Sequence, residues 1–93
     1  MIELVEQWFV ERGIAEGDGF GQLQKLREEV SELVEAREDE NRAEEIDAVG
    51  DILVVLIGYC LQRGLKIDKC LEVALEEISG RTGKVVDGVF VKD

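Results

Sequence analysis

The chain contains no histidine and no proline, and only two of its 93 residues are cysteine. The absence of histidine excludes Ser-His and Cys-His nucleophilic sites and histidine-based zinc sites. Cys60 and Cys70 lack CxxC spacing and lie in helical patterns, so we interpret both as reduced residues of the core. Aromatic residues make up only 5% of the sequence, which leaves leucine, isoleucine and valine to build that core.

Positive charge is also scarce, because 11 basic residues stand against 22 acidic ones and the net charge is −11. A nucleic-acid partner needs a basic surface that neutralises phosphates, so this class is excluded. A nucleotide substrate is not excluded, since acidic sites reach phosphates through divalent cations. No basic start or cleavage site follows Met1, and the longest apolar run, residues 52–61, is too short to span a bilayer. We therefore expect a soluble, cytoplasmic protein without a membrane partner.

In the absence of proline, glycine marks the breaks between helices. Apolar residues at helical spacing predict helices over residues 2–12, 22–37 and 43–63, with Gly64 as a stop. Asp68 is the predicted N-cap of a fourth helix, and Asp87-Gly88 between β-branched residues predicts a hairpin over residues 84–91. The fold class is thus all-α: one domain, residues 1–93, forming a four-helix bundle with a short C-terminal β-hairpin. Because so small a domain has wide apolar faces, we expect a homodimer or homotetramer to complete its core.

Two helices carry carboxylates at the margin of their apolar faces. On the helix over residues 22–37, Glu29 and Glu32 form an ExxE pair beside the apolar stripe. On the next helix, Glu44, Asp47 and Asp51 form one stripe, which becomes apolar one turn later. A short connection predicts that the two helices pack antiparallel, so these acidic edges can face each other.

Carboxylates brought that close repel, and protons, lysines or a metal ion must offset the repulsion. All-oxygen ligands are those that Mg²⁺ or Mn²⁺ prefers, so the pattern indicates a metal site. The alternative is that the acids form ordinary solvated helix faces, which are common in acidic proteins.

The order of these motifs resembles that of the MazG-like all-α NTP pyrophosphohydrolases. The resemblance rests on residues 22–33, on residues 44–56, and on residues 81–92, the last being similar to short, phage-type MazG-like members. It extends to Trp8-Phe9 before Arg12-Gly13-Ile14 and covers essentially the whole chain. It implies Mg²⁺-dependent hydrolysis of a (deoxy)nucleoside triphosphate to the monophosphate and pyrophosphate, with ExxE on one helix and ExxD on the next as ligands.

Matched residue by residue, the resemblance makes Glu29, Glu32 and Asp51 metal ligands. The glutamate expected three residues before Asp51 is replaced by Ala48, so we assign its place to Asp47 and keep Glu44 as an auxiliary acid. Loss of activity through this departure is the alternative, and it leaves an acidic helical interaction module of the same fold.

The remaining candidates act on water and substrate. Glu28 or Glu32 would accept the proton of the attacking water. Arg81, Lys84 and Lys25 would neutralise the leaving pyrophosphate. Simpler interpretations are an i, i+4 ion pair of Lys25 with Glu29, and a helix C-terminal role for Arg81 and Lys84. Trp8 would stack on the base, unless it is a core residue.

Overall fold

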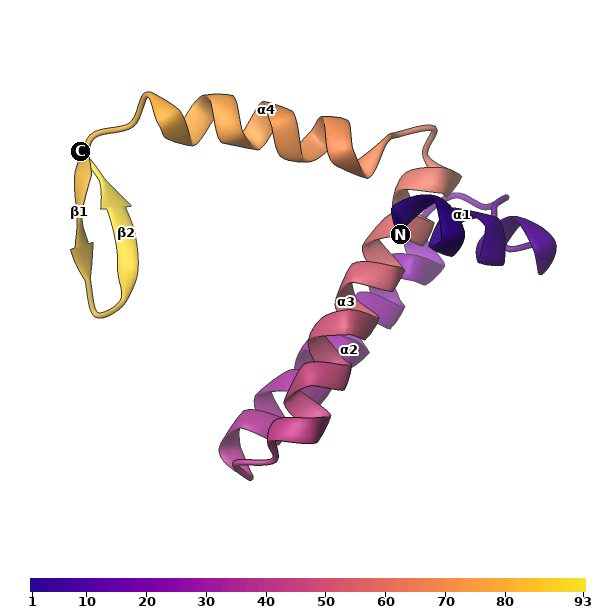
Figure 1. Ribbon diagram of the computed structural model, residues 1–93, viewed down its shortest axis with the longest axis horizontal. Helices are drawn as coiled ribbons and strands as arrows, with labels where there is room; N and C mark the ends of the chain where they lie inside the picture. The colour runs from indigo at the N-terminus through magenta and orange to yellow at the C-terminus, as the bar shows by residue number, and fades with distance from the viewer.

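The computed structural model describes residues 1–93 and contains four helices followed by a two-stranded hairpin (Figure 1). The predicted all-α fold with a C-terminal hairpin is confirmed. The elements, in chain order, are α1 (Ile2–Glu11), α2 (Phe20–Glu38), α3 (Arg42–Gln62), α4 (Ile67–Ser79), β1 (Gly83–Val86) and β2 (Val89–Lys92).

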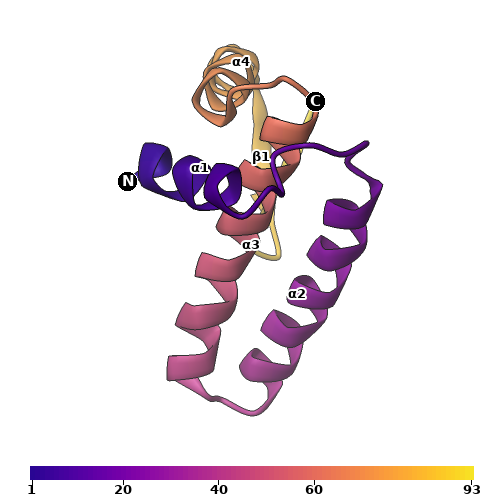
Figure 2. The ribbon, with the colours of Figure 1, turned by 90° about the vertical axis from the view of Figure 1, so that its right-hand side faces the viewer.

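Helices α2 and α3 form an antiparallel helical hairpin and lie side by side along their length (Figure 2). The turn between them ends at Asn41, whose side-chain oxygen accepts a hydrogen bond of 3.2 Å from the backbone N–H of Glu44 and so caps α3. Ala36 on α2 and Ala48 on α3 are only 2% and 4% exposed. Side chains this small allow the two backbones to approach closely, and this approach decides where the acidic residues meet.

Helix α1 packs against the apolar half of α3. The buried ring of Phe9 lies directly over Gly58, where a Cβ atom would approach the ring to 2.5 Å. The loop that follows α1 is fixed to the end of α3, because the Gln62 amide donates a hydrogen bond of 2.9 Å to the backbone oxygen of Ile14. At Gly19 the backbone has φ 88°, and a Cβ there would lie 2.8 Å from the Tyr59 ring. This loop therefore fixes the start of α2 beside α3.

The C-terminal part of the chain leaves the helical hairpin instead of closing a bundle around it (Figure 1). Helices α3 and α4 are bent by 104° at their junction, and no residue of α4 is buried. No single helix is long and apolar enough to cross a membrane; only α3 and α4 taken together pass by length and composition, across this bend.

Two sequence-based expectations for this region are wrong. Helix α4 begins at Ile67 with Lys66 as its N-cap, so Asp68 lies within the first turn, where its carboxylate accepts a hydrogen bond from the N–H of Lys69. Cys70 is exposed, so the expectation that both cysteines belong to the core fails for this residue. Cys60 is buried as expected, and burial, with a further effect of Cys70, raises the pKa of its thiol.

The predicted hairpin is confirmed around its Asp-Gly turn. Val86 pairs with Val89, and Asp87 and Gly88 both have positive φ, at 50° and 79°. This is the turn geometry whose twist matches that of two antiparallel strands. Every residue of both strands is exposed.

We predict that Gly58→Ala destabilises the protein although alanine is the better helix former. Alanine should gain about 1 kcal/mol of helix propensity, but displacing the buried Phe9 ring should cost about 1–3 kcal/mol. The free energy of unfolding in urea should therefore fall. Gly21→Ala is the matched control, since a Cβ at this helical position meets no atom within 4 Å and should leave stability unchanged or higher. Equal effects of the two variants would contradict the close contact.

Candidate active site

The centre of the site is a carboxylate in the contact between α2 and α3. Glu29 is only 5% exposed, and its Oε1 atom lies 3.3 Å from the Lys25 ammonium group. Its Oε2 atom is buried and has no hydrogen-bond partner. Burying a carboxylate oxygen without a partner is costly, so this atom is suited to a further cation.

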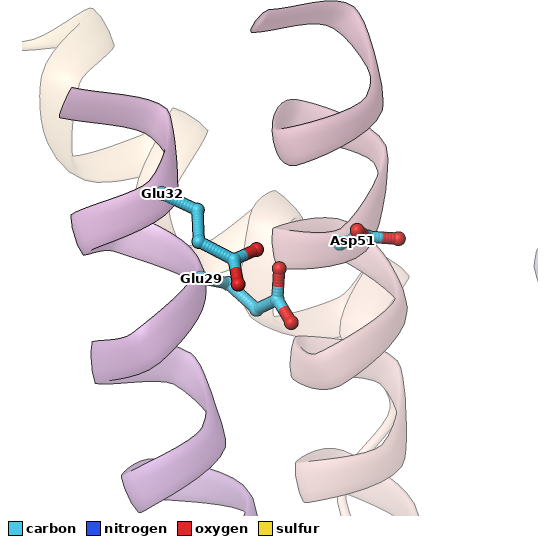
Figure 3. A group of neighbouring side chains, drawn as sticks. All are labelled: Glu29, Glu32 and Asp51. Atoms are coloured by element: carbon cyan, nitrogen blue, oxygen red, sulfur yellow. The ribbon is translucent and has the colours of Figure 1, made fainter. Parts of the chain in front are cut away.

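Two more carboxylates complete the cluster. Glu32 lies one turn after Glu29 on α2, and both extend toward α3, which carries Asp51 (Figure 3). One oxygen from each of Glu29, Glu32 and Asp51 lies within 4.8 Å of the others. Burial, with further effects of Asp47 and Glu29, raises the pKa of the Asp51 carboxyl group. The three acids are thus held together against their mutual repulsion.

These residues fit a divalent metal ion. Their donors are all carboxylate oxygens, and one of these is the unpartnered Oε2 of Glu29. Mg²⁺ and Mn²⁺ prefer such oxygen donors, and a bound dication would reverse the repulsion that the cluster otherwise carries.

Lys25 is the cation nearest to this cluster among the predicted site residues. Besides Glu29, it contacts Glu28 at 3.6 Å. The hydrogen bond and charge of Glu29, followed by the charge of Glu28, raise the pKa of Lys25. The expected i, i+4 ion pair with Glu29 is therefore present, while a role toward phosphate stays a prediction.

An apolar cavity of about 500 Å³ lies beside the acids. Lys25, Glu29 and Asp51 line this cavity, and so does Trp8. The guanidinium carbon of Arg12 lies 4.3 Å from the centre of the Trp8 ring, and the indole is 44% exposed. Trp8 is therefore not a core residue, and its position at this cavity is compatible with contact to a base. The rest of the wall comes from Phe9, Ile14, Gly21, Gln22, Val54 and Val55.

A second, smaller cavity of about 350 Å³ lies next to the cluster, toward the turn between α2 and α3. It is strongly acidic and contains Glu32, Glu44 and Asp47, with Ala48 at its wall. Asp47 is therefore not one of the three clustered acids, but it lines a cavity together with one of them, Glu32. Glu44 lines the same cavity. The position at which a glutamate was expected thus borders two acids that precede it on the same helix.

A comparison with protein families shows to which family the chain belongs. The profile of the phosphoribosyl-ATP pyrophosphohydrolases matches residues 4–77. The chain belongs to this family. No curated protein and no solved structure matches the chain. The family is one of MazG-like all-α pyrophosphohydrolases, so the resemblance described above is confirmed, and the chain has the fold of an enzyme of this kind.

The phosphoribosyl-ATP pyrophosphohydrolase match includes the three clustered carboxylates, Lys25 and Trp8 but ends before the hairpin. Arg81 and Lys84 lie beyond it, at the far end of α4 and in β1, away from the acids of the same chain (Figure 1). Arg81 contacts only Glu77 among the ion pairs, at 3.7 Å, which agrees with its helix C-terminal interpretation. Substrate roles for Arg81 and Lys84 remain predictions.

The apolar wall of the larger cavity could not be predicted from the sequence. Phe9, Ile14 and Val55 come from α1, the loop and α3, and they meet only because the loop folds back onto α3. Phe9 and Val55 lie within predicted helices, but helical periodicity gives no signal that these two residues border an acidic site.

We predict that Asp51→Asn raises the thermal unfolding temperature of the metal-free protein, because it removes a charge from a cluster of like charges. The same substitution should abolish the further rise that millimolar Mg²⁺ gives the unsubstituted protein. Differential scanning calorimetry with and without Mg²⁺ measures both effects. Glu38→Gln, an exposed acid near the end of α2, is the control and should leave the Mg²⁺ response intact. A response to Mg²⁺ that survives in Asp51→Asn would contradict the assignment.

Proposed function

We propose that the chain is a Mg²⁺-dependent pyrophosphohydrolase that cleaves a nucleoside triphosphate between its α and β phosphates. Mn²⁺ can replace Mg²⁺, because both accept an all-oxygen ligand set. The observation that carries the proposal is the unpartnered oxygen of buried Glu29, beside Glu32 and Asp51. Membership of a pyrophosphohydrolase family supports the reaction class.

Glu29, Glu32 and Asp51 would hold the metal ion, with Asp47 at the border of the cluster. When bound, such an ion neutralises phosphate oxygens and lowers the pKa of a coordinated water. The apolar cavity beside Trp8 would receive the nucleoside, which places the phosphates at the carboxylates. Burial of the base against Trp8 would orient the substrate, since aromatic rings stack on bases of any identity.

In the reaction, the water oxygen forms a bond to the α phosphorus and the bond from that phosphorus to the bridging oxygen breaks. The products are the nucleoside monophosphate and pyrophosphate, which leaves with the electron pair of the broken bond. A carboxylate accepts the proton of the water. Because Glu32 belongs to the metal cluster, we assign this role to Glu28, which lies one residue before Glu29 and is exposed. Lys25 lies where it can neutralise phosphate charge.

The name of the family specifies phosphoribosyl-ATP, which is itself a nucleoside triphosphate with an enlarged base. The proposed site acts on the part that all such compounds share, the triphosphate. The experiment is pyrophosphate release from ATP, the other NTPs, the dNTPs and phosphoribosyl-ATP, with and without Mg²⁺. We expect Mg²⁺-dependent release that falls at least about tenfold to a hundredfold in Asp51→Asn.

Glu38→Gln is the control in this assay and should retain activity. No release from any of these substrates would overturn the proposal. It would show that Ala48 in the place of the family glutamate has silenced the site and would favour the acidic interaction module.

We predict that Glu28→Gln and Glu32→Gln separate proton transfer from metal binding. Glu28→Gln should lose activity by about a hundredfold while keeping the rise in unfolding temperature with Mg²⁺. Glu32→Gln should lose both, since it removes a ligand. Steady-state kinetics together with calorimetry distinguish the two. If Glu32→Gln kept the Mg²⁺ response and Glu28→Gln lost it, the two roles would have to be exchanged.

A further inference from the structure

The C-terminal arm, residues 67–92, which comprises α4 and the hairpin, has too few contacts to be stable alone. Helix α4 touches the remainder of the chain only through α3, and the hairpin strands contact only each other among the elements. An isolated two-stranded hairpin is marginally stable in water. The arm nevertheless carries a regular apolar face, with Leu71, Leu75 and Ile78 all more than half exposed.

A long apolar groove runs beside this arm. Its volume is about 690 Å³, and its walls come from three helices. The apolar side chains that line it include Ile2 and Val5 of α1, Leu53 and Ile57 of α3, and Leu71 and Leu75 of α4. A soluble chain rarely leaves so continuous an apolar surface open, so the groove requires an occupant.

The exposed area indicates the size of that occupant. One chain exposes 7361 Å², whereas a self-contained monomer of this mass exposes about 5,400 Å². The radius of gyration is 15.6 Å, against about 12 Å for a compact domain of this length. The excess of about 2,000 Å² per chain corresponds to about 4,000 Å² for a pair, which is the size of an obligate homodimer interface.

Charge indicates where the end of the arm lies. Residues 80–93 carry three basic and two acidic side chains, a net charge of +1, whereas residues 1–79 carry eight basic and twenty acidic ones, a net charge of −12. The hairpin is thus complementary to the acidic α2–α3 edge. In its own chain it extends away from that edge (Figure 1). Lys84 makes no ion pair, so its charge is free to serve a partner.

We propose that two copies of this chain exchange their arms. The α4 helix of each copy packs against the groove of the other, and each hairpin covers the acidic cluster of its partner. Arg81 and Lys84 then complete the partner's active site, which gives them a route to the leaving pyrophosphate that is closed within one chain. This last role rests on the pyrophosphohydrolase function proposed above, whereas the exchange of arms does not.

The association is tested by sedimentation equilibrium. The unsubstituted chain should have about twice the mass of one 10.4 kDa copy. The double variant Leu71→Asp/Leu75→Asp should lose the dimer, because it places two carboxylates in the groove. Val73→Asp introduces one carboxylate on the opposite face of α4 and should remain dimeric. A monomeric unsubstituted chain, or equal loss in both variants, would overturn the proposal.

The path of the arm is tested on the unsubstituted protein by carbodiimide coupling, which joins a lysine to a carboxylate in contact with it. Chains labelled with ¹⁴N and ¹⁵N are first refolded together in equal amounts. We expect peptides that link Lys84 to the segment around Glu29 and Glu32, with one light and one heavy partner. Links found only within chains of one label would overturn the exchange. This result is independent of enzymatic activity.

The shared site is tested by mixing two inactive variants, Asp51→Asn and Arg81→Ala/Lys84→Ala. A heterodimer with exchanged arms contains one site with both defects and one intact site. Random pairing should therefore restore about a quarter of the activity of the unsubstituted dimer. No recovery, or full activity of Arg81→Ala/Lys84→Ala alone, would overturn the role of the hairpin. If the unsubstituted chain were inactive, the proposed function would fail, and the mixed-label coupling would still decide the position of the arm.

Discussion

The antiparallel contact of α2 with α3 determines most of the chemistry, because it places a carboxylate in the protein interior. Ala36 and Ala48 allow the helices to approach, and Glu29 lies between them with only one of its oxygens paired. Glu32 and Asp51 add further negative charge at the same place. A protein keeps so unfavourable an arrangement where a ligand offsets it. A divalent cation and the phosphates it attracts would do this, and the repulsion among the three carboxylates would then favour binding of the metal.

The sequence was sufficient for the helices and for the acids at their margins. Helical periodicity gave α1 to α3 nearly to the residue, and the short turn before Asn41 required α2 and α3 to be antiparallel. Successive residues of an α-helix are rotated by about 100° about its axis. Once the helices are antiparallel, this rotation predicts that Glu29 and Asp51 lie on the edges that face each other. The first turn of α4 was misplaced because Asp68 suits both the N-cap and the first turn, and only the backbone distinguishes them.

Tertiary contacts determine the wall of the cavity beside Trp8 and the direction of α4, and the sequence pattern does not predict either. The wall beside Trp8 depends on a loop hydrogen bond from Gln62 to Ile14, which joins residues 48 positions apart. The direction of α4 depends on the sharp bend after α3. The apolar face of α4, whose pattern is typical of a buried helix, is therefore exposed in the single chain. Periodicity identifies which face of a helix is apolar, but it does not say whether the same chain or a second copy covers that face. An exchanged arm would explain both the open groove and the distance of Arg81 and Lys84 from the acids.

The most direct test of the account is the binding of Mn²⁺, followed by the electron paramagnetic resonance signal of the free ion during titration. We expect saturable binding to the unsubstituted protein, which Glu29→Gln abolishes and Glu38→Gln retains. Equal weak binding by all three proteins would show that the cluster is only an acidic surface. It would contradict the claim that the buried carboxylate of Glu29 belongs to a metal centre.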